Sequence, residues 1–510
     1  MSKKVRVRFA PSPTGGLHLG GVRTVLYNYL FAKKHNGDFI LRIEDTDQSR
    51  YVAGAEEYIF KCLEWAGLTP DESPLNPGAY GPYRQSERKQ AGIYQRYADT
   101  LVNDGHAYYA FDTTEELEQM RNQYKTEQNP SPQYDRNVRL KMRNSLVLSQ
   151  QEVKELIDNG TPYVVRIKMP DDETVSFSDM IRGEVSFNTS LVDDKVLLKA
   201  DGMPTYHLAV VVDDYLMKIT HAFRGEEWLP SAPVHVLLWQ YLFGLDEMPL
   251  WAHLPLILGP NGKLSKRDGA KYGFPVFAMN WTDPKTNELT EGFSEKGFLP
   301  EAFINLLALL GWNDGTQQEL FSKEELINAF SMERVHSGGA KFDYEKAKWF
   351  NAEWIKCTDA SNLLPAVKNI LSDNHIVVID DAAAKQVINA VKDRCILLTD
   401  FVQQAGFFFQ QPANIDTASI QPKWNDAKQQ FFTHVITQFE QTENWDAAAL
   451  EQKFKDMAAA AQLKPGDVML PLRIMLVGGK FGPHVFDIAQ MLGKQETIKR
   501  MQHTLGLLAV

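Results

Sequence analysis

The chain has 510 residues, of which 44% are hydrophobic and 23% charged, so its composition excludes a disordered or fibrous protein and leaves room for three or four globular domains. A formal net charge of -11 argues weakly against RNA binding, which needs Lys and Arg, although a local basic stripe would be sufficient. No apolar run approaches 18 residues, so we expect no membrane span and a cytoplasmic protein.

The cysteines Cys62, Cys357 and Cys395 are odd in number and far apart in the sequence. Such spacing gives neither a disulfide framework nor a paired-cysteine zinc site. We therefore expect reduced, structural thiols and no zinc.

The first expected elements are a strand over residues 5–9 and a helix from about Leu19, joined by the turn PSPTGGLHLGG over residues 11–21. The free N–H groups and positive dipole end of the helix face this glycine-rich turn, which suits a phosphate. His18 is placed to donate a hydrogen bond there. The turn therefore indicates an ATP site, although an ordinary strand-turn-helix unit with a capping histidine remains an alternative.

A further strand over residues 38–43 and an amphipathic helix over residues 54–68 indicate a parallel sheet of Rossmann type. The GxGxxG fingerprint is absent. Walker A is absent too, because Gly262 and Lys263 are followed by leucine, so P-loop hydrolysis is disfavoured.

A second basic motif, KLSKR, occupies residues 263–267 after an apolar run and a Gly-Pro-Asn-Gly turn. Three cations at the end of a strand, on a loop that we expect to be mobile, suit a polyphosphate whose charge grows as it departs. A solvated basic loop is the alternative.

Charged, helix-like sequence begins near residue 113, and strand-like runs follow at 163–169 and 174–177, which indicates an insertion into the sheet. From about residue 351 amphipathic helical segments dominate, including 382–401, 446–461 and 485–508. The expected fold is thus an α/β Rossmann-type domain with an α+β insertion, followed by an all-α carboxy-terminal region.

The turn and the KLSKR motif, in this order, resemble the HIGH and KMSKS signatures of class I aminoacyl-tRNA synthetases. Four flanking segments resemble the bacterial type of glutamyl-tRNA synthetase: RIEDTD at 42–47, GPYRQSER at 81–88, PTYHLA at 204–209 and RGEEW at 224–228. The resemblance implies a ligase that activates glutamate with ATP and Mg²⁺. The glutamyl group then passes to the 2′-hydroxyl of the terminal adenosine of tRNA(Glu), with tRNA(Gln) left open as a second acceptor.

The resemblance also implies a set of site residues. The catalytic ones are His18, Lys263 and Lys266. The ATP-binding ones are Pro11, Ser12, Thr14, Gly15, His18, Gly20, Gly21, Trp228, Lys263, Ser265 and Lys266. The glutamate-binding ones are Arg8, Ala10, Ser12, Glu44, Tyr206 and Arg224.

These residue types suit a substrate with two carboxylates and one ammonium, because the planar fork of arginine binds a carboxylate in two places. We expect Arg8 and Arg224 to bind the carboxylates, Arg224 taking that of the side chain. Tyr206 would hydrogen-bond the substrate and Glu44 would accept its amino group. A surface ion pair of Arg224 with Glu226 or Glu227 is the alternative.

The chain departs from the family pattern at two positions. Gly21 replaces the second histidine of the first signature, which leaves His18 alone to contact phosphates by side chain. Val210 stands where many relatives carry an asparagine near the amino acid, so one polar contact is absent or supplied by water. Some relatives hold zinc in the insertion, but residues 99–128 contain no cysteine.

Five segments are expected by this resemblance. They are a first catalytic half (1–112), an insertion that binds the tRNA acceptor end (113–195), a second catalytic half (196–250), the KMSKS-type loop with a helical stem-contact domain (251–350) and an anticodon-binding domain (351–510). Arg394 falls at an expected anticodon contact, whereas Lys168 and Arg182 suit solvated strand faces better than RNA contacts. No sustained heptad occurs, which favours a monomer.

Three rival interpretations share parts of this pattern. A glutaminyl-tRNA synthetase would have a β-barrel carboxy-terminal half, and a glutamyl-queuosine enzyme would end before the carboxy-terminal domain. An inactive tRNA-binding relative would keep the fold without the catalytic residues, yet His18, Lys263 and Lys266 are all present.

Overall fold

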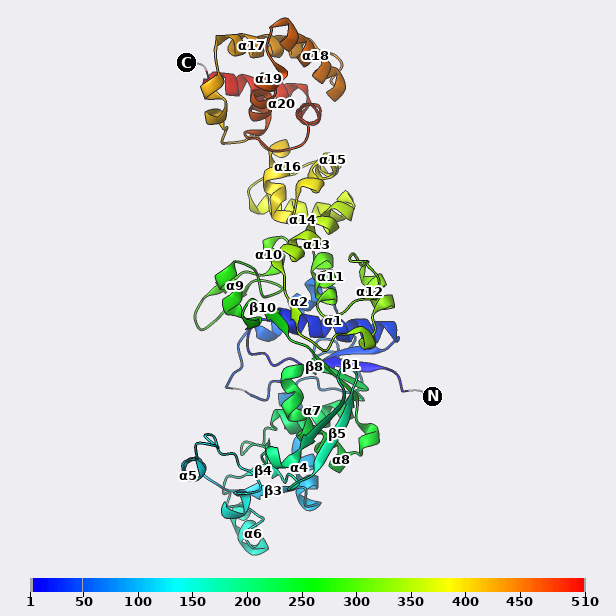
Figure 1. Cartoon of the computed structure of the whole chain (residues 1–510), viewed down its shortest axis with the longest axis vertical. Coiled ribbons are helices and arrows are strands. Elements are labelled where there is room, and N and C mark those ends of the chain that lie inside the picture. The colour runs from blue at the N-terminus through cyan, green and yellow to red at the C-terminus, as the bar shows by residue number, and fades with distance from the viewer. Residues whose placement is uncertain (1–2, 48, 509–510) are drawn as a thin grey trace. The chain divides into compact units, whose positions relative to one another are not determined.

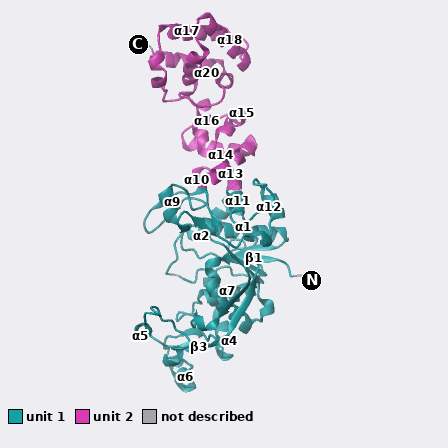
Figure 2. Ribbon diagram, in the orientation of Figure 1, with its two compact units in different colours: residues 1–295, 303–343 teal, residues 296–302, 344–510 magenta. Residues whose placement is uncertain are grey.

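The computed structural model describes residues 3–47 and 49–508. It divides into two compact units, coloured separately in Figure 2. Unit 1 comprises Met1–Glu295 and Phe303–Asp343, and unit 2 comprises Lys296–Ala302 and Tyr344–Val510.

A six-stranded sheet forms the centre of unit 1, in the order β2-β1-β8-β9-β5-β6 (Figure 1). All neighbouring pairs are parallel except β5 with β6. The strands are β1 (Arg6–Phe9), β2 (Asp38–Leu41), β5 (Thr174–Asp179), β6 (Gly183–Asn188), β8 (His221–Gly225) and β9 (Leu250–Leu254). The mainly parallel, doubly covered sheet confirms the α/β fold class.

Helices cover both faces of this sheet. Ala222 and Phe223, neighbours on β8, point to opposite faces: Ala222 belongs to a core with α7 and α8, whereas the Phe223 ring lies 5.1 Å from the Phe31 ring of α1. The helices near the sheet are α1 (Leu19–Lys34), α2 (Ala55–Trp65), α3 (Gln85–Gln90), α4 (Ile93–Asn103), α7 (Tyr206–Leu216) and α8 (Ala232–Leu242). Apolar side chains on two sides hold the strands, and with them the loops at the strand ends, in fixed positions.

A smaller antiparallel sheet, β3-β4-β7, forms a lobe of unit 1 together with α5 and α6 (cyan in Figure 1). Its elements are β3 (Ala107–Ala110), α5 (Thr114–Tyr124), α6 (Gln150–Asp158), β4 (Val164–Ile167) and β7 (Val196–Leu198). The strand-like run at 174–177 is part of β5, which pairs with β9 through Asp179 and Trp251. Residues 113–195 therefore supply two strands to the central sheet as well as most of the lobe.

The rest of unit 1 consists of short strands and helices that follow β9. These are β10 (Ile257–Gly259), β11 (Gly262–Lys263), α9 (Lys266–Tyr272), β12 (Trp281–Thr282), β13 (Leu289–Thr290), α12 (Lys323–Ala329) and β14 (Ala340–Lys341), with α10 (Phe293–Lys296) and α11 (Pro300–Leu309) divided between the units. β10 pairs with both β11 and β14, which fixes the start of the KLSKR motif beside the central sheet.

Unit 2 is helical throughout the part that the structure describes, which confirms the expected all-α region. Its helices are α13 (Tyr344–Cys357), α14 (Ala360–Asp373), α15 (Asp381–Val391), α16 (Phe401–Phe409), α17 (Asp426–Glu440), α18 (Ala447–Ala460), α19 (Pro465–Val477) and α20 (Val485–Leu508). Two apolar cores hold them together, one built mainly on α14 to α16 and one on α17 to α20. No helix among the described residues is long and apolar enough to cross a membrane.

Candidate active site

A cavity of about 930 Å³ opens where β1 and β8 end at their carboxyl edges. Arg8 and Ala10 border it from β1, and Arg224 and Gly225 border it from β8. Ligands of open α/β sheets bind at this edge, because the loops that follow the strands converge there.

Thirteen of the residues expected to bind ATP or glutamate line this cavity. They are Arg8, Ala10, Pro11, Ser12, Thr14, His18, Gly20, Gly21, Glu44, Tyr206, Arg224, Trp228 and Lys263. Segments from four widely separated parts of the sequence therefore meet at one place.

Gly15, Ser265 and Lys266 are not among the residues that line the cavity. Gly15 lies in the turn before α1 with a φ of 149°, which glycine adopts more readily than other residues. Lys168 is exposed after β4, and Arg394 is exposed on unit 2.

The amino terminus of α1 borders the cavity without a side chain in the way. A Cβ added at Gly20 would meet no heavy atom of the described residues within 4 Å, so the free backbone N–H groups of the first turn can be approached closely. At Gly16 a Cβ would come within 2.9 Å of Trp281, and at Gly21 within 2.7 Å of Leu17. These two glycines serve packing, and Gly20 serves access to the helix end.

His18 precedes α1 with its proton placed for donation. Its Nδ1 accepts a hydrogen bond from the N–H of Gly20 at 3.5 Å, so the proton of the neutral ring lies on Nε2. Nε2 is buried and has no hydrogen-bond partner among the described residues. Burial, with Lys263 and Lys266 nearby, lowers the pKa of His18 to about 4. The ring is thus a neutral donor at neutral pH.

The KLSKR motif is more ordered than the loop that the sequence indicates. Lys263 belongs to β11, and Lys266 begins α9. Ser265 caps this helix, since its hydroxyl donates to the Asp268 carboxylate at 2.7 Å and accepts from the Asp268 N–H. A sequence-local capping box explains this order.

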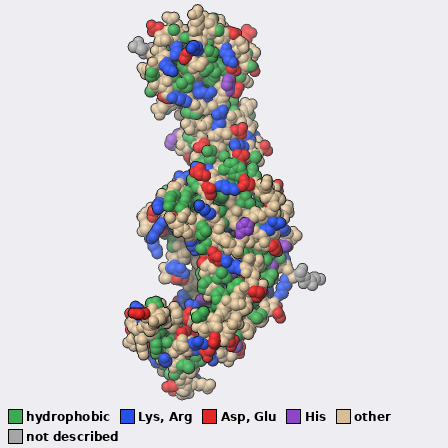
Figure 3. Space-filling view, in the orientation of Figure 1, with side chains coloured by type: hydrophobic (Ala, Val, Ile, Leu, Met, Phe, Trp, Pro, Cys, Tyr) green, Lys and Arg blue, Asp and Glu red, His purple; other side chains and the backbone are tan. Residues whose placement is uncertain are grey.

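Both lysines of this motif are exposed, and Figure 3 shows Lys and Arg side chains (blue) on the surface where Figure 1 places α9. Lys263 pairs with Glu227 at 3.2 Å, and the Lys266 ammonium lies 5.0 Å from the centre of the Phe277 ring. The same ring stands edge-on to His18, with centroids 6.1 Å apart. Phe277 therefore brings Lys266 and His18 to one place.

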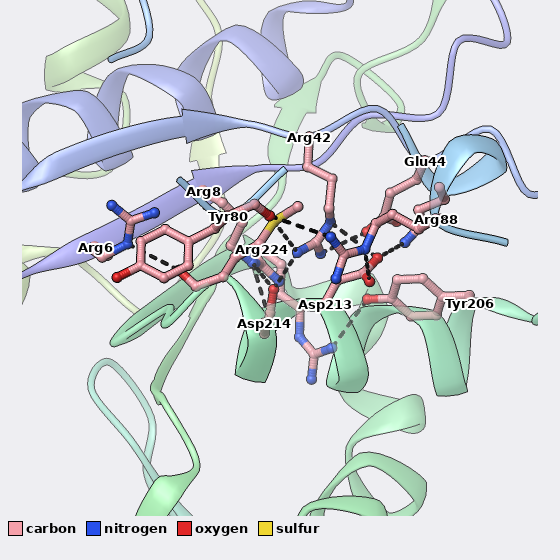
Figure 4. A network of polar contacts seen from close by, with 12 residues as sticks. Arg6, Arg8, Arg42, Glu44, Tyr80, Arg88, Tyr206, Asp213, Asp214 and Arg224 are labelled. Carbon is pink, nitrogen blue, oxygen red and sulfur yellow. Dashed lines mark hydrogen bonds and ion pairs between the residues drawn. The ribbon is translucent and has the colours of Figure 1, made fainter. Parts of the chain in front are cut away.

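Arg8 is held by a buried network of opposite charges (Figure 4). Its Nε donates to Asp214 of α7 at 3.1 Å, and its Nη1 donates to the Phe223 carbonyl at 3.4 Å. Arg42 bridges Asp214, at 2.7 Å, to Glu44, at 2.9 Å. Burial raises the pKa of Glu44, although Arg42 and Arg8 oppose this. The network fixes one arginine and one carboxylate at the cavity wall.

Asp213, beside Asp214 on α7, anchors the helices behind the site. It accepts hydrogen bonds from Arg88 Nε at 2.6 Å, Gln85 Nε2 at 2.8 Å and the Tyr94 hydroxyl at 2.9 Å. All of these side chains are buried. A buried charge that is fully hydrogen-bonded holds its surroundings in one arrangement, so α3, α4 and α7 keep fixed positions behind the cavity.

Arg224 has a different set of partners. Its Nε donates to His253 Nε2 at 2.9 Å, and its Nη1 donates to His235 Nδ1 at 3.0 Å and to the Tyr206 hydroxyl at 3.2 Å. Its guanidinium carbon lies 4.7 Å from the centre of the Trp251 ring. Nη2 is buried and has no hydrogen-bond partner among the described residues. Nη2 of this buried cation therefore keeps its N–H donors unpaired, and Arg224 is one of the residues that line the cavity.

The alternative of a surface ion pair for Arg224 is wrong. Glu226 pairs with Arg182, and Glu227 pairs with Lys263. Arg224 itself is 7% exposed. Arg182 is also not the solvated strand residue that we expected, because Glu226 and the His253 carbonyl hold it.

Tyr206 and Trp228 form an aromatic wall beside Arg224, with ring centroids 4.3 Å apart. The Tyr206 oxygen accepts from Arg224, which leaves the hydroxyl hydrogen for another acceptor. Burial raises the pKa of Tyr206, so the hydroxyl stays protonated. Val210 lines the cavity on the next turn of α7 and adds an apolar surface.

Sequence reasoning missed the supporting residues Asp213, Asp214, Arg42, His235 and His253. A sequence signal was present for the two aspartates: they directly follow the apolar run 208–212, which is typical of a buried helix. Both are buried in the structure. The histidines lie within apolar runs as well, where the sequence does not reveal that they face an arginine.

A Rossmann-type sheet that brings an open helix terminus, a neutral histidine and two lysines beside buried arginines indicates an enzyme that activates an acid with a nucleotide. Residues 4–349 match the family described as tRNA synthetases class I (E and Q), catalytic domain, and residues 360–505 match an anticodon binding domain. The fold and the site thus define a class I tRNA synthetase.

Full-length relatives narrow this class. The chain is 49% identical over 510 residues to the glutamate–tRNA ligase of Christiangramia forsetii and 50% identical over 511 residues to that of Flavobacterium johnsoniae, each match covering 100% of both chains. The chain belongs to the glutamate–tRNA ligase family.

A solved structure is similar throughout the chain. It is the crystal structure of a glutamate tRNA ligase from Elizabethkingia meningosepticum in complex with its amino acid, with a TM-score of 0.92 and 47% identity, covering 99% of this chain and 100% of that one. The glutamate tRNA synthetase of Elizabethkingia anophelis gives a TM-score of 0.88 at 48% identity, with the same coverage.

Proposed function

We propose that this chain is a glutamate–tRNA ligase, which forms glutamyl-adenylate from glutamate and ATP and transfers the glutamyl group to the terminal adenosine of tRNA(Glu). The observation that carries the proposal is the buried Arg224 at the cavity, whose Nη2 has no partner among the described residues. An uncompensated cation in a dry site favours an anionic side chain such as that of glutamate.

The amino acid would lie between the two fixed arginines. Arg224 and the Tyr206 hydroxyl would bind the side-chain carboxylate, and Arg8 would attract the α-carboxylate. Glu44, held by Arg42 at 2.9 Å, would accept the ammonium group. Ala10 and Ser12 line the adjoining wall. Such fixed groups orient the α-carboxylate toward the nucleotide, which supplies much of the rate.

ATP would lie along the α1 terminus and the Trp228 side, with Pro11, Ser12, Thr14 and Gly15 in the turn beneath it. A carboxylate oxygen of glutamate attacks the α-phosphorus, and the bond to the pyrophosphate oxygen breaks. His18 and the helix terminus would hold the phosphates, while Lys263 and Lys266 would neutralise the departing pyrophosphate. Mg²⁺ would arrive bound to the ATP phosphates as part of that substrate.

In the second step the 2′-hydroxyl of the terminal adenosine attacks the glutamyl carbonyl, and AMP leaves. The lobe within 113–195 would bind the acceptor end, residues 251–350 the stem, and unit 2, including Arg394, the anticodon. Residues 1–112 and 196–250 would form the two catalytic halves. We expect the chain to act as a monomer.

The experiment is charging of labelled glutamate onto separately purified tRNA(Glu) and tRNA(Gln), with ATP, Mg²⁺ and a matched glutamine reaction. Charging of tRNA(Glu) alone would support a discriminating ligase, and charging of both tRNAs a non-discriminating one. Charging of glutamine, or no charging, would contradict the proposal. ATP–pyrophosphate exchange with tRNA present would then show whether activation still occurs.

A further inference from the structure

Two pairs of residues meet the Arg224 guanidinium from different elements, each through one buried histidine, His253 or His235. His253 of β9 and Asp179 of β5 form one pair, joined by a 2.6 Å contact between Nδ1 and Oδ2. His235 of α8 and His207 of α7 form the other, joined at 3.1 Å between Nε2 and Nδ1. Each pair presents one ring nitrogen to Arg224.

The protons in both pairs follow from the chemistry of arginine, which can only donate. His253 Nε2 and His235 Nδ1 must therefore accept, and both rings must be neutral. The remaining hydrogen of His253 then lies on Nδ1 and is donated to Asp179. That of His235 lies on Nε2 and is donated to His207. Asp179 and His207 thus select the ring form that can accept from the arginine.

Arg8, in the same cavity, shows how an arginine with a different task is held. Asp214 contacts it directly at 3.1 Å, so much of its charge is neutralised by the protein. For Arg224 no ion pair with a carboxylate occurs among the described residues, and its hydrogen-bond acceptors are neutral nitrogens and one hydroxyl oxygen. Its position is fixed by three hydrogen bonds while its charge is left for a ligand.

We propose that His253 and His235 are positioning residues for the amino-acid substrate: they orient Arg224 through neutral nitrogen acceptors and so direct its charge and its free Nη2 at the side-chain carboxylate. Asp179 and His207 keep the two rings in the required form. This inference rests on the proposed function and names residues that determine its preference for glutamate over glutamine.

Burial and the proximity of Arg224 support the neutral state of these rings. They lower the pKa of His235 well below its ordinary value. Burial also lowers the pKa of His253, despite the opposing hydrogen bond to Asp179, and the pKa of His207 to about 4. All three rings therefore remain neutral acceptors or donors at physiological pH.

The expected consequence is selectivity. A carboxylate neutralises the free guanidinium and satisfies Nη2 with a charge-assisted hydrogen bond. The amide of glutamine offers one neutral oxygen and also places an N–H₂ group beside a cation, which leaves the charge uncompensated. A guanidinium that could swing away would lose this discrimination.

Matched substitutions separate orientation of Arg224 from packing. His253→Asn keeps a donor near Asp179 but is too short to reach Arg224, whereas His253→Gln places an amide oxygen near the former Nε2. At His235 the Asn variant is the one that keeps an acceptor for Arg224, because it places its oxygen near the former Nδ1. The Gln variant places its amide near the former Nε2 and loses that acceptor. Each position thus has one variant that keeps an acceptor for Arg224 and one that loses it.

The measurement is steady-state charging of tRNA(Glu) by the full chain, giving kcat and KM for glutamate and for ATP, with calorimetric titration of glutamate and thermal melting. We expect His253→Asn and His235→Gln to raise the glutamate KM by about tenfold or more, the value of one hydrogen bond to a charged group. The ATP KM should not change, and the preference over glutamine should fall. His253→Gln and His235→Asn should retain most glutamate affinity.

Equal glutamate KM values within each matched pair would overturn the inference. So would KM values for glutamate and ATP that rise together in proportion to a fall in melting temperature. Its failure is distinct from that of the proposed function. If the unmodified chain charges no glutamate, the proposed function is wrong and the inference falls with it. If the unmodified chain charges glutamate and the matched variants do not differ, only the inference is wrong.

Discussion

The two sides of the cavity hold their cations in opposite ways. On the side proposed to bind the amino acid, the Arg8 side chain is 5% exposed and is fixed by Asp214, and Arg224 is buried among hydrogen-bond acceptors. On the side proposed to bind the phosphates, the Lys263 side chain is 59% exposed, and Glu227 is its one ion-pair partner among the described residues.

The difference matches what each side must recognise. The charges of an amino acid are present before and after binding, so rigid partners lose little on association and reject wrong shapes. The charge of a departing pyrophosphate appears only during the reaction, and a flexible ammonium can follow it as it grows. Under the proposed function, rigid groups would serve selection and flexible groups would serve turnover.

The strongest test of this contrast is Arg224→Leu. Removing a buried cation that meets a substrate carboxylate should lower kcat/KM for glutamate by about a thousandfold, because the carboxylate would then be buried unpaired. Arg224→Lys is the matched control: it keeps the charge and loses the fork, so it should retain part of the activity. Charging kinetics measure both. A Leu variant with an unchanged glutamate KM and a normal kcat would contradict the role of Arg224.

On the flexible side, Lys266→Ala should lower kcat by about a hundredfold with little change in the glutamate KM, since its charge acts in the transition state. ATP–pyrophosphate exchange, run with tRNA, measures this step. Lys271→Ala, in the last turn of the same helix, is the control. Equal losses in kcat and glutamate affinity would rule out the assigned role.

The rigid side should also be the stable side. Asp214→Asn leaves Arg8 and Arg42 without their shared carboxylate and should cost about 3 kcal/mol in the free energy of unfolding. Urea denaturation followed by circular dichroism measures the change.

The difference in unfolding free energy between the Asp214→Asn variant and the parent chain depends on pH with a definite sign. Burial alone would raise the pKa of Asp214, but Arg8 and Arg42 hold it below its ordinary value in the folded protein. The stabilisation is therefore complete above the unfolded pKa of about 3.9 and is lost as the pH falls through the lower folded pKa. A difference between Asn variant and parent that grew on acidification would refute this account.

The smallest effect should come from Glu227→Gln. It removes the Lys263 ion pair, in which both side chains are more than 40% exposed. Exposed pairs contribute little, so the ATP KM should change by less than about fivefold and the melting temperature hardly at all. A large loss of ATP affinity would mean that Glu227 positions Lys263, and the phosphate side would then be as rigid as the other.

Much of this arrangement could be predicted from the sequence. The 3.6-residue repeat after residue 19 and the alternation over 5–9 predicted α1 and β1, and both are present. The fold class, the family and the helical nature of unit 2 are confirmed. The roles of individual site residues stay predictions, although the structure gathers most of them around one cavity.

What the sequence could not reveal depends on contacts between distant residues. The sequence placed Arg8 on a strand and at the site, but it did not reveal that Asp214, 206 positions later, would hold the side chain. His253 and His235 lie in apolar runs that predict burial but not the arginine between them. The 174–177 run has the alternation of a strand, yet only hydrogen bonds to β9 decide which sheet it joins. Local pattern carries none of this information.

The distance along the chain between these partners also matters during synthesis. Arg8, Arg42 and Arg88 are made long before the two aspartates on α7 that pair with them, by 206, 172 and 125 residues. A nascent chain emerges from the ribosome amino terminus first, so these guanidinium groups must stay in water until α7 has appeared. A chain that stops before Asp214 also lacks β8 and β9, which join β1 to β5 in the central sheet, so only longer chains can form the cavity.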